Sequence, residues 1–139
     1  MAAFSRKLFS SLFFPLSWTL LTIVLLCLPG SAFPDDDGLL GFDFEFEHMD
    51  KVVHVILFGG IVLFWGLYRI YRLQQQQPPV PAKAIILYIV FSIALGVALE
   101  YVQFYFIPLR SFDKYDIVAD SAGAIVAGGF LLLTKRRKS

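Results

Sequence analysis

The sequence AIILYIVFSIALGVALEYVQFYF occupies residues 84–106, and it decides the fold class. Glu100 is the only charged residue in this stretch. A helix needs about 20 predominantly apolar residues to cross the hydrocarbon core of a bilayer. Lipid offers no hydrogen-bond partner to an open backbone, so an apolar span of this length must be helical. Residues 84–106 are therefore predicted to form a transmembrane helix.

Three further apolar segments extend this interpretation to most of the chain: residues 8–28, 52–71 and 117–133. Apolar residues make up 58% of the sequence, charged residues only 17%, and the mean hydropathy is +0.70. Soluble domains average about 45–50% apolar and about 25% charged residues. The prediction is an all-α, four-helix transmembrane bundle that forms a single domain over residues 1–139. The lone cysteine, Cys27, excludes a disulfide within the chain.

The basic residues predict the direction of the spans. With both termini in the cytoplasm, nine of the 12 Lys and Arg residues fall on the cytoplasmic side. This agrees with the positive-inside bias of short-loop membrane proteins. The three remaining basic residues, Lys51, Arg110 and Lys114, would lie outside. All 11 acidic residues, from Asp35 to Asp120, then belong to the outer half of the molecule.

Residues 8–28 have an alternative interpretation as a cleaved signal peptide. Basic residues precede the apolar run, and the small residues at 30–32 resemble a cleavage site. The apolar run is nevertheless about twice as long as the usual 7–15-residue core of a signal peptide. A retained first span is therefore favoured, and the remaining spans keep their directions in either case.

Polar residues recur near the predicted outer end of three spans. On each of these spans two polar residues are three or four positions apart, so they share one helix face; the pairs are Asp50 with His54, Glu100 with Gln103, and Asp116 with Asp120. At about 1.5 Å of rise per residue, they fall into one layer just below the outer surface. The candidate ligand-binding residues are Asp50, Lys51, His54, Glu100, Gln103, Arg110, Asp116 and Asp120.

Several carboxylates in a low-dielectric layer cannot all stay ionised without a cation. Arg110, His54, Lys51 or a bound metal could supply the positive charge, or one carboxylate could stay protonated; the titrations would then be coupled. The layer could be a structural network, each hydrogen bond contributing around 0.6 kcal/mol between helices. It could also be a ligand-binding or catalytic site, since ionisable residues inside a membrane are typical of function. Neither a catalytic residue nor a metal ligand is assigned by spacing alone.

Small residues recur at four-residue spacing in the last span, which predicts close helix packing there. The pairs are Gly123 with Ala127 and Ala124 with Gly128. Gly59, Gly60 and Gly96 carry the same expectation for the two preceding spans.

Taken in order, these motifs resemble the VanZ-like family of small bacterial membrane proteins. The resemblance is carried by DKVVH at 50–54, EYVQF at 100–104, Arg110, and DIVADSAG at 116–123. An initial membrane helix followed by a proline-containing outer stretch also fits, and the similarity extends over about residues 16–133. The family pattern usually has asparagine after the aspartate of the last helix. This chain has Asp120 there, which adds a carboxylate to the layer.

The resemblance implies a multi-pass protein of the bacterial plasma (inner) membrane with a role in the cell envelope. The family is named for a protein that lowers susceptibility to the glycopeptide antibiotic teicoplanin, so antibiotic resistance is one implied outcome. The resemblance does not supply a reaction.

Three functions are compatible with these features. The leading hypothesis is binding of a polar lipid headgroup or an envelope precursor in the outer layer, with Arg110 as the anion contact because its planar fork matches phosphate or carboxylate. The alternative is a membrane-embedded, metal-assisted hydrolase or transferase acting on lipid-linked substrates; His and carboxylates suit a divalent ion, but no HExxH-type signature is present. Ion transport ranks last, because carriers usually place coupling residues near the midplane. No cofactor and no nucleic acid is expected, and bilayer lipid is the expected partner.

Overall fold

The computed structural model describes residue 9 and residues 11–29, 49–73, 81–108 and 110–136. Its main elements are four helices, α2 (Phe13–Cys27), α3 (Met49–Leu73), α4 (Ala82–Phe106) and α5 (Lys114–Arg136). No strand occurs within these ranges. The predicted all-α class is therefore confirmed.

Local sequence explains where α4 begins and ends. Pro81 precedes its first residue in an extended conformation, and its fixed φ suits the entry to a helix. At the other end, Ile107 is extended, with φ −102° and ψ 117°. Pro108 follows it, and a proline disfavours the helical conformation of the residue before it. The chain leaves α4 at this point and turns toward α5.

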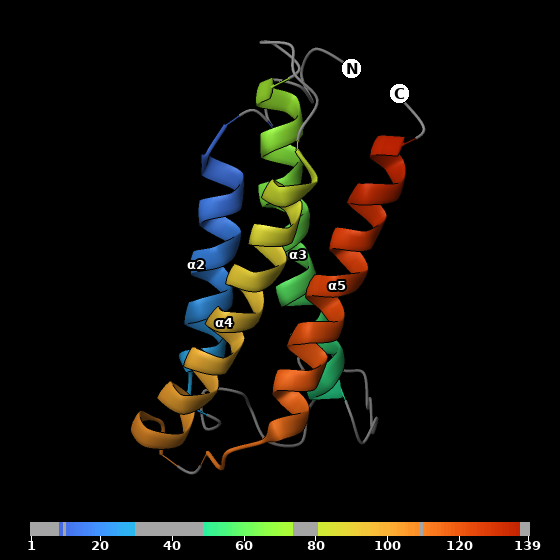
Figure 1. Cartoon of the computed structure of the whole chain (residues 1–139). Coiled ribbons are helices and arrows are strands. Elements are labelled where there is room, and N and C mark those ends of the chain that lie inside the picture. Colours follow the sequence, from blue (N-terminus) through green and yellow to red (C-terminus); the bar gives the residue numbers. More distant parts are fainter. Residues whose placement is uncertain (1–8, 10, 30–48, 74–80, 109, 137–139) are drawn as a thin grey trace.

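The helices run alternately up and down, so the first residues of α3 and α5 and the last residues of α2 and α4 share one end of the bundle (Figure 1). Helix α3 packs against each of the other three helices. Helix α4 in turn contacts both α2 and α5. Polar residues on α3, α4 and α5 can therefore meet at the common end.

Three helices are long and apolar enough to cross a membrane: Asp50–Arg72, Ala82–Phe106 and Lys114–Thr134. The fourth, α2, has 15 residues, which at about 1.5 Å per residue extends about 22 Å, short of a hydrocarbon core about 30 Å thick. The predicted start of the first span at residue 8, the basic residues before it and the loop at 30–48 lie outside the described residues. The structure thus supports a multi-pass membrane protein with three candidate spans.

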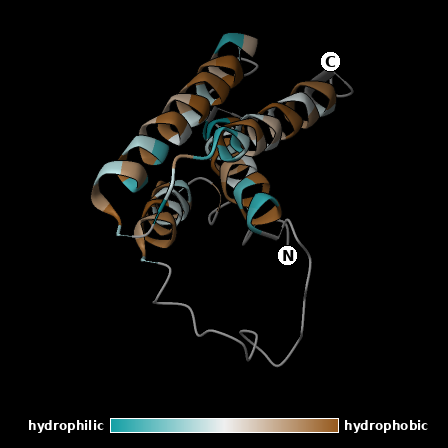
Figure 2. Ribbon diagram, turned by 90° about the horizontal axis from the view of Figure 1, so that it is seen from below, coloured by the Kyte–Doolittle hydropathy of each residue, from teal (hydrophilic) through white to brown (hydrophobic). Residues whose placement is uncertain are grey.

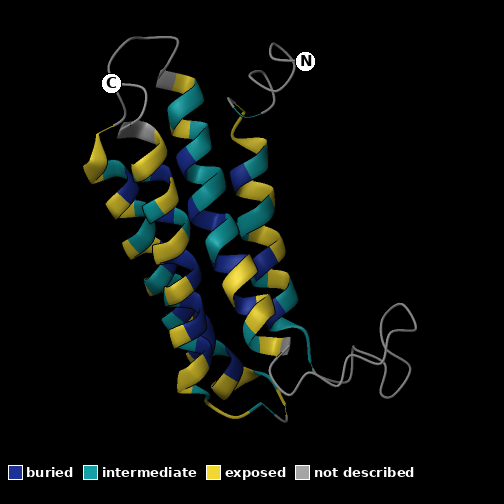
Figure 3. Cartoon of the chain, turned by 90° about the vertical axis from the view of Figure 1, so that its right-hand side faces the viewer, coloured by how far each residue is buried: buried dark blue, intermediate teal, exposed yellow. Residues whose placement is uncertain are grey.

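The distribution of large apolar and ionisable side chains is the inverse of that in a soluble protein. Large apolar side chains face outward, for example Val126 at 70% exposure and Phe91 at 46%, while Glu100 and Asp120 are each only 2% exposed. Hydrophobic residues make up most of each helix (Figure 2), and the buried residues follow the faces that meet neighbouring helices (Figure 3). An apolar surface this extensive is unsuited to water. Lipid is its natural solvent.

The closest helix contact joins α3 and α5. A Cβ atom added to Gly123 would lie 2.9 Å from the carbonyl carbon of Val55 and closer still to its oxygen. A Cβ added to Gly59 would lie 3.1 Å from the carbonyl oxygen of Gly123. Only glycine permits the two main chains to approach this closely, as the small-residue pattern predicted.

Two tryptophans connect α2 to α3, and Trp65 of α3 donates its indole N–H to Thr19 Oγ1 at 3.2 Å. The Trp18 indole N–H donates to the carbonyl of Leu57 at 2.9 Å. The same indole lies against Gly60, where a Cβ atom would overlap it. Nearby, Leu57, Phe58 and Ile61 form a buried apolar cluster that closes the centre of the bundle.

Candidate functional site

Six of the eight candidate residues come together at the end of the bundle where α3 and α5 begin and α4 ends (Figure 1). We call this set the polar layer; its members are Asp50, Lys51, His54, Glu100, Asp113, Asp116 and Asp120. All but Asp113 were predicted from the sequence. The side chains of His54, Glu100, Asp116 and Asp120 are buried.

His54 of α3 and Asp120 of α5 form the deepest contact of the layer. The ring Nδ1 lies 2.8 Å from Asp120 Oδ1. The other ring nitrogen, Nε2, lies 3.8 Å from Asp116 Oδ2, which is beyond hydrogen-bond distance. The two aspartates, four residues apart on α5, thus lie beside opposite nitrogens of one imidazole.

The carboxylate of Asp120 also fits a space created by glycine. A Cβ atom at Gly96 of α4 would lie 2.5 Å from Asp120 Oδ2. Alanine at this position would therefore push the carboxylate away from α4. Gly96, which was predicted to permit close helix packing, therefore also leaves room for the buried Asp120 carboxyl group.

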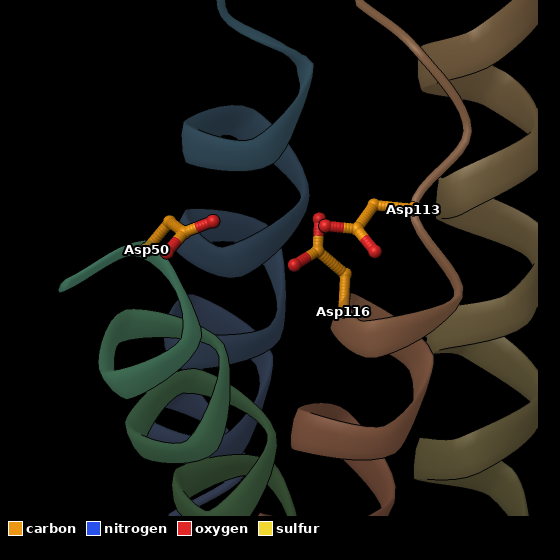
Figure 4. Close-up of side chains that lie close together, drawn as sticks. All are labelled: Asp50, Asp113 and Asp116. Carbon is orange, nitrogen blue, oxygen red and sulfur yellow. The ribbon is translucent and has the colours of Figure 1, made fainter. Parts of the chain in front are cut away.

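Lys51 lies at the outer edge of the layer and is surrounded by three carboxylates. Its Nζ is 2.7 Å from Asp50 Oδ2, 2.6 Å from Asp113 Oδ2 and 2.5 Å from Asp116 Oδ1. One oxygen from each of these aspartates lies within 4.8 Å of the others, and Figure 4 shows the three side chains approaching one another from the starts of α3 and α5 and the segment before α5. Of the three side chains considered from the sequence as sources of positive charge, Lys51 contacts the most carboxylates.

Asp113 was missed by the sequence analysis, although it ties the layer to the α4–α5 connection. Its Oδ1 accepts the N–H of Tyr115, two residues on, which caps the first turn of α5. Its own N–H donates to Glu100 Oε1 at 2.5 Å. The predicted span began at residue 117, four positions after Asp113, so its role as N-cap follows only from the observed start of α5 at Lys114.

The Lys51 ammonium holds the pKa of the Asp113 carboxyl below its ordinary value of 3.8, and the Tyr115 N–H acts in the same direction. Asp113 lies outside the membrane-spanning segments, at the water-facing edge of the layer. Its carboxylate is therefore ionised at neutral pH and available to pair with the lysine.

Two predicted members contribute less to the layer. Gln103 is buried, but its side-chain N–H donates to the carbonyl of Leu26 at 2.7 Å, so it fastens α4 to α2. Arg110 is half-buried, and its backbone N–H donates to the carbonyl of Ile107. Within the described ranges its guanidinium forms no hydrogen bond or ion pair.

Charge is unbalanced across the layer. Its five acidic members, Asp50, Glu100, Asp113, Asp116 and Asp120, face one lysine and one histidine. Burying unpaired carboxylates is costly, so protons or a further cation must neutralise part of the excess. This arrangement can coordinate a cation, accept protons or hold a ligand amine.

No model of a known protein family, no curated protein and no solved structure matches this chain. The resemblance to the VanZ-like family therefore rests on the motifs quoted from the sequence itself.

Proposed function

We propose that this chain is a VanZ-like integral membrane protein of the bacterial cell envelope that binds the polar headgroup of a lipid or of an envelope precursor at the outer leaflet. In this proposal α2 belongs to a fourth span, both termini are cytoplasmic, and the protein resides in the plasma (inner) membrane. An effect on glycopeptide susceptibility is a consequence to be tested.

The observation that carries the proposal is the depth at which the polar layer converges. His54, Glu100 and Asp120 each lie five or six residues inside the helix end nearest to them, which at about 1.5 Å per residue is about 8–9 Å. This is the region where headgroups meet the hydrocarbon core. The layer occupies one end of the bundle and does not form a path across it, which favours binding over transport.

The basic residues support the proposed orientation. Arg69 and Arg72 lie near the end of α3 that is opposite the layer, and Lys83 lies near the start of α4 at that same end. Positive charge on that side favours a cytoplasmic location for it. The polar layer then lies toward the outside.

Two cations near the α4–α5 connection suit a headgroup phosphate. Arg110 is a half-buried residue of that connection, and Lys114 begins α5 with its ammonium 5.4 Å from the ring centre of Tyr115. Arginine offers paired N–H donors that match a phosphate, whereas lysine offers a point charge.

Lipid retention by the purified full chain tests the proposal. Mass spectrometry would compare the lipids that remain with the wild-type chain, Arg110→Lys, Glu100→Gln and the control Arg72→Lys, which is exposed at the opposite end. We expect a specific anionic or zwitterionic lipid with wild type and Arg72→Lys, and at least a fivefold loss with Arg110→Lys, since the bidentate contact is removed. Glu100→Gln keeps an acceptor for the Asp113 N–H, so the fold should survive.

The same four chains would be expressed in a susceptible bacterium and compared for glycopeptide survival. Equal lipid retention in wild type and Arg110→Lys would refute the headgroup site. Loss of lipid only where the variant also loses its helical structure would assign the layer to helix cross-linking instead.

A further inference from the structure

The geometry points to a divalent metal site in which His54 Nε2 and Asp116 Oδ2 are the protein ligands and Asp120 orients the imidazole. We propose Zn²⁺ as the ion, because an imidazole nitrogen combined with a carboxylate oxygen suits it better than Mg²⁺ or Ca²⁺. The inference is independent of the headgroup proposal, and either can fail alone.

The first step is the state of the histidine. Histidines that bind metals almost always donate their other ring N–H to a carboxylate, carbonyl or water. His54 has this arrangement, with Nδ1 at 2.8 Å from Asp120 Oδ1. A neutral imidazole held in this way carries its lone pair on Nε2. Within the described part of the chain this nitrogen forms no hydrogen bond, and the Asp116 carboxylate is the charged group beside it.

The second step is the atom that Nε2 faces. Asp116 Oδ2 lies 3.8 Å away, too far for a hydrogen bond and suitable for two ligands of one ion. With metal–ligand distances of about 2.1 Å, two ligands are roughly 3.4 Å apart at a tetrahedral angle, and 3.8 Å corresponds to an angle of about 130°. Small side-chain rotations bring the pair into the tetrahedral range.

The third step is the orientation of the Asp116 carboxylate. Its Oδ1 is held by the Lys51 ammonium at 2.5 Å, so its Oδ2 is directed inward toward the imidazole. Lys51 thereby plays the same part for Asp116 that Asp120 plays for His54. Both ligands are fixed by partners outside the ion's own coordination shell, as metal sites require.

The fourth step is charge. The layer has more carboxylates than cations, because Lys51 alone faces three of them. A divalent ion between His54 and Asp116 would neutralise part of the remaining negative charge. Two protein ligands leave coordination positions for water or for the oxygens of a small anionic ligand. This is one protein ligand fewer than in a typical catalytic zinc site, so water or the bound ligand must fill the remaining positions.

Zinc binding by the full chain in detergent tests the inference. The chelator-stripped protein would be titrated with Zn²⁺ alone by calorimetry, and its thermal unfolding would be followed with and without the ion. We expect one ion per chain and a raised unfolding temperature in wild type. Asp120→Asn keeps a hydrogen-bond acceptor for Nδ1 but removes its charge, so affinity should fall by about 10–100-fold.

Substitutions at two sites locate the ion. His54→Gln should abolish binding and the thermal shift, whereas the control Arg72→Lys, exposed at the opposite end of α3, should leave both intact. Co²⁺ in place of Zn²⁺ should give a visible spectrum in wild type and Arg72→Lys but not in His54→Gln, and Asp113→Asn would be titrated alongside them. A wild-type chain that binds no zinc overturns the inference, and so does zinc that depends on Asp113 but not on His54, since the ion would then lie among the Lys51 carboxylates.

Discussion

Replacing Gly123 by alanine should separate α3 from α5. The added Cβ would lie 2.9 Å from the Val55 carbonyl carbon, whereas ordinary contacts begin near 3.4 Å. The helices must therefore move apart by at least about 0.5 Å, and the still closer carbonyl oxygen demands more. Val55 presents main-chain atoms here, so no side-chain rotation can relieve the overlap. Overpacking of this kind typically costs about 1–3 kcal/mol, and we expect the upper half of that range.

Gly129 of the same helix provides the matched control, because a Cβ atom there would meet nothing within 4 Å. Both substitutions gain about the same helix propensity, up to about 1 kcal/mol for glycine to alanine. The difference in unfolding free energy between the two variants therefore isolates the steric cost at the α3–α5 contact. Gly129→Ala should be as stable as wild type or more so.

Unfolding of the full chain in mixed micelles of increasing denaturing-detergent content, followed by circular dichroism, would give the two free energies. We expect Gly123→Ala to be about 2–3 kcal/mol less stable than Gly129→Ala. Equal unfolding free energies for the two variants would show that α3 and α5 are not in main-chain contact at Gly123, and would refute this prediction.

Three further predictions concern single contacts. Trp18→Phe should cost around 0.6 kcal/mol or somewhat more in the same unfolding assay, since it removes the hydrogen bond to Leu57. Ser92→Ala, which removes a buried hydroxyl bonded to a helix carbonyl, should cost a similar amount. Carbon-13 titration of the Asp113 carboxyl should give a pKa below 3.8, and Lys51→Met should return it toward 3.8. Because the folded pKa is the lower one, the Lys51 contact contributes stability above pH 3.8 and loses it as the pH falls through the folded pKa; a pKa unchanged by Lys51→Met would contradict the pairing.

The long helices were predictable because lipid imposes a simple rule on sequence. An apolar run of sufficient length must be helical, so α4 was expected from residues 84–106 and begins only two residues earlier, at Ala82. The starts of α3 and α5 were predicted three residues too late. Hydropathy marks the part of a helix that is soluble in lipid, whereas backbone hydrogen bonds continue into the polar turn beyond it.

The depth of the polar residues was also predictable, because residues three or four apart on a helix share a face. Their pairing was not. Lys51 and Arg110 were both available as the cation, and choosing between them requires the rotation of α3 and the path of the connection after α4. The sequence contains neither. Asp113 escaped notice because the polar first turn of α5 was not predicted, and the residue is its N-cap only when the helix begins at Lys114.

The glycine contact and the charged layer depend on each other. Histidine and aspartate are short side chains, so a 2.8 Å contact between His54 and Asp120 requires their helices to lie unusually close. Gly123 follows Asp120 by less than one turn, and Val55, the residue it approaches, follows His54 directly. A larger residue at position 123 would therefore lengthen the ion contact as well as strain the helices. The close contact between His54 and Asp120 in turn shields their charges from lipid. A wider gap between the helices would let lipid reach them. Selection for close packing and selection for the polar site cannot be separated at this crossing, and Gly123→Ala should weaken zinc binding as well as the fold.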